Sequence, residues 1–491
     1  MHLAMLLQMA ADGMPERVAH GHGGSHVTMD QLAARCRRAG AYLAAQAGER
    51  VALVDLNSEA VPVALFGAAL AGKPFVPINY RLTDDQLKAI LVRTAPAVAI
   101  VGDGVAERVG DIDGIELVSR ADFLAAADDP AGAEVEDMFG GDPDDIAVLL
   151  YTSGTTGEPK AAVLRHKNLA AYILGSVEFA GSGEDEAAIV SVPPYHIAGV
   201  SSVLSSTYSG RRVVHLEAFE PAEWVRLVRQ EDVSHAMVVP TMLGRILDVI
   251  EADGGGLPSL RALSYGGGPM PVPVIERAMA LLPAVGFVNA YGLTETSSTI
   301  ALLGPDDHRA AFSSDDPAVR ARLGSVGRPL PSIEVEIRDG EIWVRGEQVS
   351  GEYLGKGPGA EGGWFCTRDA GHLDDGGYLF VHGRLDDVIV RGGENLSPGE
   401  IEAVLLEHPA VEEAAVVGVP DTEWGEKVMA AVVLRDDEKV DEDELRDLVR
   451  SKLRSTRTPE RIQFRAELPY NETGKLLRRV LRDELAAAYS S

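Results

Sequence analysis

The segment 151–160, with the sequence YTSGTTGEPK, constrains the fold more than any other stretch of the chain. It follows the apolar residues 146–150, which are typical of a short buried strand. Gly154 and Gly157 permit a sharp turn after this strand, because they lack the Cβ that restricts other residues. The hydroxyls of the segment and the ammonium of Lys160 suit an anion, and a polyphosphate is the best match. The sequence therefore predicts a strand that ends in an anion-binding loop.

A second interpretation of this loop is open, because clusters of Ser, Thr and Gly are also typical of solvated loops that bind nothing. The segment also differs from the usual P-loop, in which the lysine directly follows the second glycine. Here Glu158 and Pro159 separate Gly157 from Lys160. Motifs elsewhere in the chain must decide between the two interpretations.

Length and composition narrow the class of protein. A chain of 491 residues exceeds one ordinary domain, and it predicts either about three units or one large body with a smaller one. The hydrophobic fraction of 46% and the charged fraction of 24% are those of a globular protein rather than a disordered one. A net charge of -30 argues against nucleic acid or an anionic membrane as a diffuse partner. Any anionic ligand must therefore be met by local positive groups.

Cysteine content and hydropathy predict a soluble, cytoplasmic protein. Cys36 and Cys366 lie too far apart in the sequence for a metal cluster or a disulfide framework. Residues 1–17 have no basic leader and no cleavage signature. The most apolar stretch, residues 60–71, is shorter than the roughly 20 residues that a membrane span requires. We therefore expect no transmembrane segment, and peripheral membrane contact stays open.

The first third of the chain alternates strand and helix signals. Residues 51–56 and 97–101 read as buried strands, and the mostly apolar residues 59–71 read as a helix, which predicts a parallel sheet. Thr83 and Gln86 form a capping-box pattern at the start of a further helix. Later strand candidates are residues 187–192, 233–239, 260–265 and 284–288.

Polar or glycine-rich loops follow three of these later strands. The sequence after the last one, NAYGLTE, contains a tyrosine that can stack on a purine, a threonine that can donate to phosphate, and Glu295, an oxygen ligand suited to Mg²⁺. Thr294 and Glu295 alone would equally fit a helix cap. His196 lies in the apolar sequence PPYHIAG, where a single histidine is also compatible with a purely structural role.

The remainder of the chain changes character. Residues 333–337 and 342–345 alternate apolar and polar positions around Asp339 and Gly340, which predicts a hairpin in a small β subdomain. The tail reads as an α+β domain with strands at 411–419 and 427–434 and a helix at 441–453. Its first helix is predicted to begin with a capping box at Ser397 and Glu400.

In their order along the chain, these motifs resemble the adenylate-forming superfamily, which includes acyl- and aryl-CoA synthetases, peptide-synthetase adenylation domains and beetle luciferases. The resemblance spans residues 51–479. It implies an α/β fold with a large N-terminal body of parallel-type sheets and helices plus a small β subdomain, followed by a mobile α+β C-terminal domain. The implied boundaries are 1–385 for the adenylation domain and 386–491 for the mobile domain. Asp386 would be the hinge.

The resemblance also implies roles for particular residues. Lys475, in the sequence LPYNETGK, would be the catalytic lysine, and Glu295 would bind Mg²⁺. Thr294 and His196 would complete the catalytic set. The ATP- and CoA-binding residues would be Thr152, Ser153, Gly154, Thr155, Thr156, Gly157, Lys160, Gly266, Gly267, Gly268, Asn289, Ala290, Tyr291, Gly292, Asp369, Arg384, Gly392 and Gly393. The acyl pocket would be lined by Tyr195, His196, Ala198, Gly199, Gly266 and Gly267.

Within this set, Asp369 would accept from the ribose hydroxyls, Arg384 would reach ribose and phosphate, and Gly392 and Gly393 would border the pantetheine tunnel. The chain departs from the family pattern at three positions. Arg368 and Ala161 stand where Gly is usual, and Tyr470 stands where Arg is frequent.

The implied function is that of an ATP-dependent acyl-CoA synthetase, which uses ATP, Mg²⁺ and coenzyme A. It would convert a carboxylic acid to acyl-AMP with release of pyrophosphate and then transfer the acyl group to coenzyme A. His196, with no acidic residue beside it, favours an uncharged fatty, aryl or alicyclic tail. Three alternatives stay open, namely an acyl-AMP ligase that loads a carrier protein, a luciferase-like oxygenase and a nucleotide-binding pseudoenzyme. The oligomeric state, monomer or homodimer, is also open.

Overall fold

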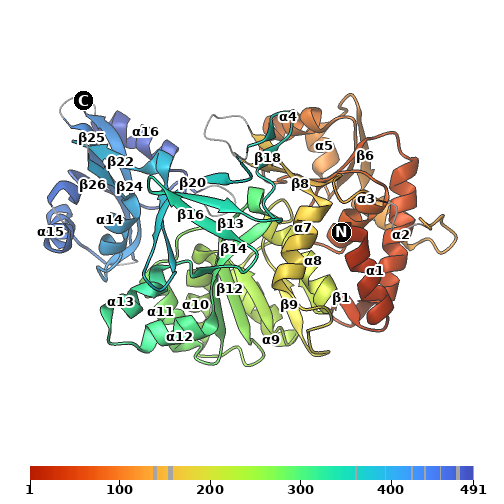
Figure 1. Ribbon diagram of the computed structural model, residues 1–491, viewed down its shortest axis with the longest axis horizontal. Helices are drawn as coiled ribbons and strands as arrows, with labels where there is room; N and C mark the ends of the chain where they lie inside the picture. The colour runs from red at the N-terminus through yellow and green to blue at the C-terminus, as the bar shows by residue number, and fades with distance from the viewer. Residues whose placement is uncertain are drawn as a thin grey trace.

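The computed structural model describes residues 1–136, 141–152, 159–359, 362–392, 394–421, 424–435, 438–453, 455–470 and 476–489. Four sheets organise the chain (Figure 1). Two large sheets and a small one make up the first 384 residues, and the fourth lies in the C-terminal domain, which is blue in Figure 1. The predicted α/β architecture with a separate C-terminal α+β domain is confirmed.

One large sheet has eight strands in the order β19-β18-β8-β7-β4-β3-β5-β6. They are β3 (Arg50–Val54), β4 (Phe75–Pro77), β5 (Ala97–Val101), β6 (Ile115–Ser119), β7 (Ile146–Thr152), β8 (Lys160–Arg165), β18 (Glu352–Tyr353) and β19 (Gly357–Pro358). The five strands from β3 to β7 pair in parallel. Strand β8 pairs with β7 in the antiparallel sense, and β18 does so with β8. The sheet is therefore mixed rather than uniformly parallel.

Helices cover both faces of this sheet, which explains why its central strands are apolar on both sides. A core lies between one face of this sheet and the second large sheet, which is described below. The helices in this core are α1 (Leu3–Gly13), α2 (Met29–Ala45), α3 (Ala60–Leu70), α6 (Arg120–Asp128), α7 (His166–Ser176) and α8 (Ile197–Ser209). The other face carries α4 (Asp84–Thr94) and α5 (Val105–Val109). Helix α4 begins at the predicted capping box, in which the Thr83 hydroxyl accepts from the Gln86 N–H and the Gln86 side chain accepts from the Thr83 N–H.

The second large sheet has nine strands in the order β15-β14-β13-β12-β11-β9-β10-β1-β2. They are β1 (Val18–His22), β2 (Ser25–Thr28), β9 (Ala187–Val190), β10 (Arg212–His215), β11 (His235–Val238), β12 (Ala262–Gly266), β13 (Gly286–Leu293), β14 (Ser298–Leu303) and β15 (Arg328–Pro329). Its own core includes helices α9 (Pro221–Gln230), α10 (Pro240–Asp253), α11 (Val272–Leu281) and α12 (Pro305–Ser313). Beyond α12 lie α13 (Pro317–Arg320) and the 3₁₀ turn η2 (Ala321–Gly324).

The small sheet has the order β16-β17-β20-β21 and is antiparallel throughout. Its strands are β16 (Glu334–Arg338), β17 (Glu341–Arg345), β20 (Phe365–Leu373) and β21 (Leu379–Arg384). Asp339 and Gly340 connect β16 to β17 with φ values of 51° and 81°. Two positive φ angles are what a two-residue hairpin turn with the right twist requires, and the predicted hairpin is confirmed.

The C-terminal domain has a five-stranded sheet with helices on both faces. Its elements are β22 (Ile389–Arg391), β23 (Glu394–Leu396), α14 (Pro398–Leu405), β24 (Val411–Asp421), β25 (Gly425–Leu434), α15 (Glu442–Lys452), η4 (Ser455–Arg457), β26 (Arg461–Arg465) and α16 (Arg478–Tyr489). Helices α14 and α15 share one core with the sheet, and α16 shares the other. The predicted capping box at Ser397 is wrong, because the Ser397 hydroxyl donates to the His382 carbonyl (2.9 Å) instead of capping α14.

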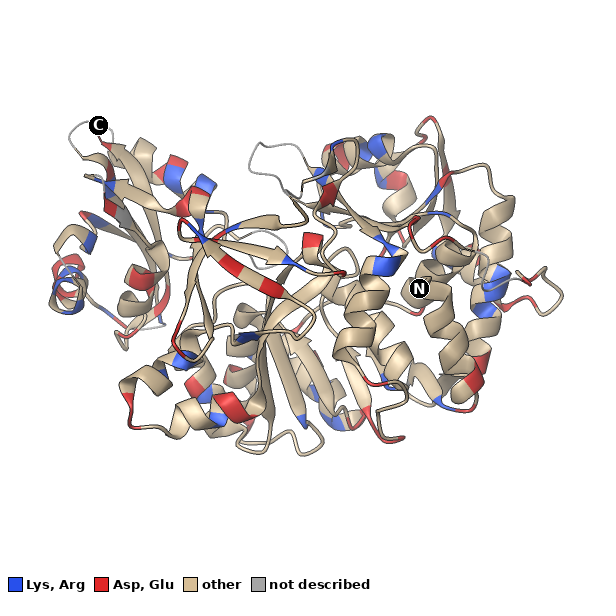
Figure 2. Ribbon diagram, in the orientation of Figure 1, with Lys and Arg blue, Asp and Glu red and all other residues tan. Residues whose placement is uncertain are grey.

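Charged side chains are concentrated on the outer helices and loops, while the central strands of the body carry few of them (Figure 2). Among the described residues, no helix combines the length and the hydropathy that crossing a membrane requires.

Candidate active site

Hydrogen bonds between side chains join the three sheets of the N-terminal body at one place. The Tyr291 hydroxyl on β13 donates to Asp369 Oδ2 on β20 (2.6 Å). The Tyr353 hydroxyl on β18 donates to Oε1 of Glu295, which lies in the 3₁₀ turn η1 (Thr294–Thr296) after β13. Each of these strands belongs to a different sheet. The predicted Mg²⁺ ligand and the predicted ribose-binding acid therefore both lie where the three sheets meet.

Asp369 lies in a closed network of polar groups. It is paired across β20 and β21 with Arg384, whose Nη1 lies 3.2 Å from Asp369 Oδ1. The same nitrogen donates to the Thr367 carbonyl (2.6 Å), and the Thr367 hydroxyl accepts from the Asp369 N–H (3.1 Å). The Asp369 side chain is only 11% exposed, and its hydrogen bonds hold both carboxylate oxygens in position.

Electrostatics in this network favour the protonated tyrosine and the charged arginine. Burial raises the pKa of Tyr291 well above its ordinary value, and the charge of Asp369 raises it further. Burial alone would lower the pKa of Arg384, but the charges of Asp369 and Glu295 outweigh it and raise that pKa. Tyr291 and Arg384 therefore act as fixed hydrogen-bond donors to the carboxylate between them.

Glu295 is held mainly through its backbone. The Ser350 and Gly351 N–H groups donate to its carbonyl (2.9 and 3.1 Å), and Gln348 Nε2 donates to the Thr296 carbonyl (3.1 Å). Segment 346–353 is thereby fastened to the turn that carries Glu295. The Glu295 residue is 7% exposed. Burial, and then the charge of Glu295, raise the pKa of Tyr353, so its hydroxyl keeps the proton that it donates.

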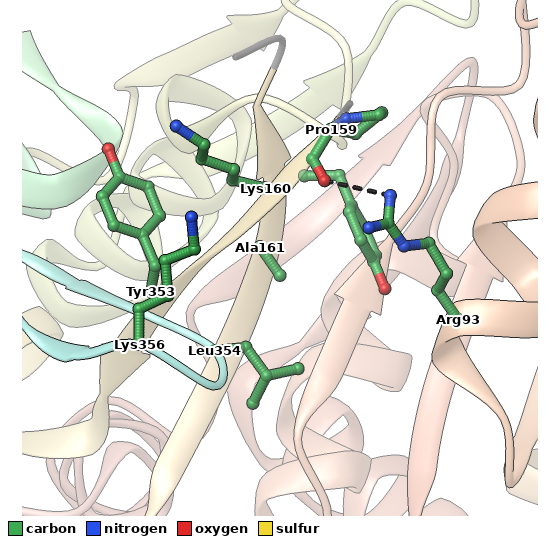
Figure 3. Close-up of a pocket in the computed structure, with 8 residues that line it drawn as sticks. Arg93, Pro159, Lys160, Ala161, Tyr353, Leu354 and Lys356 are labelled. Carbon is green, nitrogen blue, oxygen red and sulfur yellow. Dashed lines mark hydrogen bonds between the residues drawn. The ribbon is translucent and has the colours of Figure 1, made fainter. Parts of the chain in front are cut away.

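A cavity of about 250 Å³ adjoins the predicted phosphate loop (Figure 3). Its described lining residues include three cations and no carboxylate. They are Arg93, Tyr151, Pro159, Lys160, Ala161, Tyr353, Leu354 and Lys356. The amines of Lys160 and Lys356 point to the side on which the Tyr353 ring lies, and Arg93 reaches the Pro159 carbonyl (3.2 Å) from the opposite side of β8 (Figure 3). In a chain with a net charge of -30, this cavity is a local positive site that suits phosphate.

The glycines at the strand ends are needed for different structural reasons. A Cβ on Gly266 would lie 2.3 Å from the Ala290 carbonyl oxygen, and one on Gly292 would lie 1.8 Å from that of Ser298. Both glycines thus permit close contact between neighbouring strands. Gly267 has a φ of 81°, and a Cβ on Gly268 would face open space. Gly268 is therefore the position where the bare backbone could lie against a flat ring.

Four of the predicted acyl-pocket residues lie where the chain enters α8, with Tyr195 and His196 before the helix and Ala198 and Gly199 in its first turn. His196 caps α8, since its Nδ1 accepts from the Ala198 N–H (3.1 Å). Tyr195 is buried and packs edge-on against Tyr80, with ring centroids 5.7 Å apart. A Cβ on Gly199 would lie 2.6 Å from the Pro193 carbonyl oxygen. Structural roles account for His196 and Gly199, and their contact with an acyl group stays a prediction.

Other predicted residues have structural contacts or lie outside the described chain. Asn289 is buried and donates to the Ser325 carbonyl (3.0 Å), and the Thr152 hydroxyl donates to the Lys160 carbonyl (3.4 Å). Gly392 has a φ of 58° and lies against Trp424. Asp386 lies in the 3₁₀ turn η3 (Leu385–Asp387) between β21 and β22. The residues outside the described ranges are Ser153, Gly154, Thr155, Thr156, Gly157, Gly393 and Lys475.

Comparison with known proteins agrees with this arrangement. The profile of the AMP-binding enzyme family matches residues 7–358, and that of the AMP-binding enzyme C-terminal domain matches residues 400–475. The chain belongs to the AMP-binding enzyme family. A feruloyl-CoA synthase of Amycolatopsis is 34% identical over 95% of this chain and 96% of its own. A long-chain-fatty-acid–CoA ligase of Mycobacterium tuberculosis is 32% identical over 94% and 93%.

Solved structures of AMP-binding enzymes are similar along the whole chain. The o-succinylbenzoate CoA synthetase from Bacillus subtilis, in complex with its acyl-adenylate intermediate, superposes with a TM-score of 0.82 at 30% identity and covers 97% of this chain and 98% of its own. The amide bond synthetase McbA from Marinactinospora thermotolerans superposes with a TM-score of 0.86 at 29% identity and covers 98% and 99%. The expected fold of the adenylate-forming superfamily is thereby confirmed.

The three departures from the pattern of this enzyme family have visible structural settings. Arg368 has a φ of 60°, a left-handed conformation in which glycine is least strained. Ala161 is buried in β8, and its carbonyl accepts from the Leu354 N–H (2.9 Å). Tyr470 pairs with Leu476 in an isolated β-bridge, and burial raises its pKa, with the neighbouring Glu413 adding to the effect.

Sequence reasoning missed Tyr353, Lys356 and Arg93. Tyr353 and Lys356 follow the predicted hairpin in a stretch without periodicity, and β18 is only two residues long. Arg93 lies in the last turn of α4, where a basic side chain is ordinary. The pairing of β18 with β8 brings together segments that are far apart in the sequence. Only the structure shows that these side chains line one cavity.

Proposed function

We propose that this AMP-binding enzyme is an ATP-dependent acyl-CoA synthetase. It activates a carboxylic acid as acyl-AMP, releases pyrophosphate, and transfers the acyl group to coenzyme A. The observation that carries this proposal is the meeting of Glu295, the Asp369–Arg384 pair and the cationic cavity around Lys160 at the junction of three sheets. Such a site offers groups for ribose, for phosphates and for a divalent cation together.

In the first half-reaction, a carboxylate oxygen attacks the α-phosphorus of ATP, and the bond to the bridging oxygen of pyrophosphate breaks. Both reactants are anions, so cations must reduce their repulsion. Lys160, with Lys356 beside it, faces the leaving phosphates, while Asp369 accepts from the ribose hydroxyls. Arg384 fixes Asp369 and lies close enough to Glu295 for the charge of Glu295 to affect its pKa.

Glu295 suits a Mg²⁺ ion that is shared with the nucleotide. Mg²⁺ is commonly bound by one or two carboxylates plus phosphates and waters. Within the described ranges no three His, Cys, Asp or Glu side chains converge as a metal site. When bound, Mg²⁺ would neutralise charge on the phosphates. Glu295 is buried and fixed by its backbone contacts, so it is already in place for this role.

In the second half-reaction, the thiolate of coenzyme A attacks the acyl-AMP carbonyl and AMP leaves. We assign the adenylation domain to residues 1–385 and the mobile domain to residues 386–491, with Asp386 as hinge. Lys475 serves the first half-reaction, and Gly392 and Gly393 border the pantetheine tunnel in the second. The position of Asp386 in η3, between the last strand of the small sheet and the first strand of the C-terminal domain, supports this boundary.

The acid substrate has an uncharged tail, aromatic or aliphatic. Tyr195 before α8 and Ala198 in its first turn are buried next to His196, and neither is ionised. The relatives named for feruloyl-CoA and long-chain-fatty-acid–CoA synthesis make phenylpropenoic and fatty acids the first candidates. The setting is the cytoplasm, where the two free thiols of Cys36 and Cys366 are stable.

A pyrophosphate-release screen tests this function. Purified protein is given ATP, Mg²⁺ and a panel of phenylpropenoic, benzoic and fatty acids, with and without coenzyme A. We expect acid-dependent pyrophosphate release and, with coenzyme A, a thioester detected by mass spectrometry. If no acid in the panel caused pyrophosphate release and labelled pyrophosphate did not exchange into ATP, the pseudoenzyme would be favoured.

Two further arms of the screen test which acceptor receives the acyl group and which half-reaction requires Lys475. A phosphopantetheinyl carrier protein and a simple amine replace coenzyme A, and faster acyl transfer to either one would contradict the thioester assignment. Lys475→Ala should lose adenylation but retain thioester formation from supplied acyl-AMP. Equal loss of both half-reactions would remove Lys475 from its assigned role.

A further inference from the structure

Tyr353 contacts two groups of opposite charge in the site. Strand β18 pairs with β8 so that Tyr353 lies opposite Ala162. Lys160 is two residues before Ala162 and therefore projects from the same face of β8, diagonally across from Tyr353. The Lys160 ammonium lies over the Tyr353 ring, 6.0 Å from its centroid, and Figure 3 shows the two side chains next to each other. The hydroxyl of the same ring donates to Glu295.

The position of Tyr353 is fixed by the segment that carries it. Gln348 donates to the Thr296 and Thr299 carbonyls (3.1 and 2.8 Å), and the N–H groups of Ser350 and Gly351 donate to the Glu295 carbonyl. Directly before Tyr353 in β18, Glu352 forms a bidentate ion pair with Arg165 of β8 (2.9 and 3.0 Å). Tyr353 is thus attached to both the η1 turn and β8, and it keeps a constant place between their charged side chains.

A lysine over the face of the Tyr353 ring and a glutamate at its hydroxyl would attract each other if the tyrosine side chain were absent. The flexible side chain of Lys160 would then fold onto Glu295, and the pair would offer neither a cation to phosphate nor a carboxylate to a metal ion. A tyrosine prevents this pairing because its ring occupies the space and its hydroxyl satisfies only one carboxylate oxygen. No other hydrogen bond to the Glu295 carboxylate is recorded among the described residues.

We propose that Tyr353 is a positioning residue that orients Glu295 towards a divalent cation and keeps Lys160 and Glu295 from pairing, so that both face the nucleotide. This role rests on the proposed function. Tyr353 does not touch the reacting atoms, and it acts through the two residues that it separates. The ring and the hydroxyl have different tasks, so two substitutions can distinguish them.

The test measures direct binding of ATP, without acid or coenzyme A, by titration calorimetry in Mg²⁺ and in EDTA. Tyr353→Phe keeps the ring but loses the hydroxyl. We expect its gain in ATP affinity from Mg²⁺ to fall about tenfold, with affinity in EDTA within about twofold of wild type. Tyr353→Leu also loses the ring, so its affinity in EDTA should fall about tenfold as well. Tyr42→Phe, on α2 against Phe123, is the matched control and should bind as wild type does.

A double variant checks the cause. Glu295→Gln cannot form an ion pair, so Tyr353→Leu combined with Glu295→Gln should regain affinity for ATP in EDTA. Normal Mg²⁺ dependence in Tyr353→Phe, or no recovery in the double variant, would overturn the inference. Tyr353→Phe removes one oxygen atom only, so it decides the outcome if Tyr353→Leu does not fold. A wild-type protein that binds no ATP would instead contradict the proposed function itself.

Discussion

Glu295 and Asp369 are two buried carboxylates in one site, and each accepts a hydrogen bond from a tyrosine. Their other partners differ. Asp369 is also paired with Arg384, whereas the Glu295 carboxylate has only Tyr353 among the described hydrogen-bond donors. The charge of Asp369 is therefore balanced within the protein, whereas no direct ion pair among the described side chains balances that of Glu295. The first arrangement suits neutral hydroxyl groups, and the second suits a cation.

The difference shows how one site can provide separate positions for a sugar and for a metal ion. A carboxylate with an arginine partner gains little from a further cation, but its remaining lone pairs still accept from hydroxyls. A carboxylate fixed by backbone contacts and one phenol retains its attraction for a divalent ion. Substitutions that exchange or remove these partners should separate the two roles.

The largest effect is expected for Glu295→Gln, which removes the charge but keeps the shape. The backbone contacts from Ser350 and Gly351 remain, so folding should be unchanged. We expect kcat/KM for acid-dependent pyrophosphate release to fall by about 10² to 10³, because charge on the phosphates is no longer offset. Steady-state kinetics over a range of Mg²⁺ concentrations measure this. A loss no greater than that of Asp369→Asn would remove the distinction between the two carboxylates.

Asp369→Asn should act on ribose rather than on Mg²⁺. It removes the partner of Arg384 and weakens acceptance from the ribose hydroxyls, so KM for ATP should rise about tenfold to thirtyfold. The discriminating measurement uses 2′-deoxy-ATP and 3′-deoxy-ATP. Wild type should discriminate against them, and the variant should lose most of that discrimination. A variant that still discriminates as strongly as wild type would place the ribose elsewhere.

Tyr291→Phe should have a smaller effect than either carboxylate substitution. Asp369 loses one donor but keeps Arg384, and we expect KM for ATP to rise about fivefold, equivalent to about 1 kcal/mol. Its Mg²⁺ dependence should match wild type, unlike that of Tyr353→Phe. If Tyr291→Phe and Tyr353→Phe gave the same pattern, the two tyrosines would not have separate roles.

The smallest effect is expected for Arg368→Gly, next to Asp369. Glycine removes left-handed strain of about 1 kcal/mol at φ 60°, but it also makes the unfolded chain more flexible by a similar amount. The free energy of unfolding should therefore stay within about 0.5 kcal/mol of wild type in urea denaturation. Arg368→Val, which adds a β-branched residue at this φ, should lose about 1 to 2 kcal/mol. Equal stability of all three proteins would mean that the backbone of β20 at this position adjusts to its residue.

Local signals in the sequence predicted much of the fold. The capping box at Thr83, the Asp339–Gly340 turn and the strand over Ala97–Val101 each depend on a few neighbouring residues, and the structure confirms them. Glu295, Asp369 and Arg384 could be named because each lies in a sequence motif that resembles the pattern of the adenylate-forming superfamily. Their convergence from different strands is visible only in the structure.

Features that depend on distant pairing were not predictable in the same way. The strand at residues 146–150 was expected within a parallel body, and no strand was predicted over Lys160–Arg165. The connection between β7 and β8 is too short for a parallel crossover, and the two strands pair antiparallel. Ser397 had a capping pattern, yet the nearby His382 carbonyl is a competing acceptor. Tyr353 carried no local signal, because its importance comes from Lys160 over its ring and Glu295 at its hydroxyl, which are both distant in the sequence.

The cationic cavity around Lys160 lies in a protein whose net charge is -30. An anionic substrate therefore approaches against a long-range repulsive field and is attracted only at close range. At physiological ionic strength the field of exposed charges decays over about 8 Å, so salt screens the repulsion more than it screens the partly enclosed cavity. The association rate of ATP should consequently rise with moderate ionic strength, opposite to the behaviour of an enzyme with a positive surface.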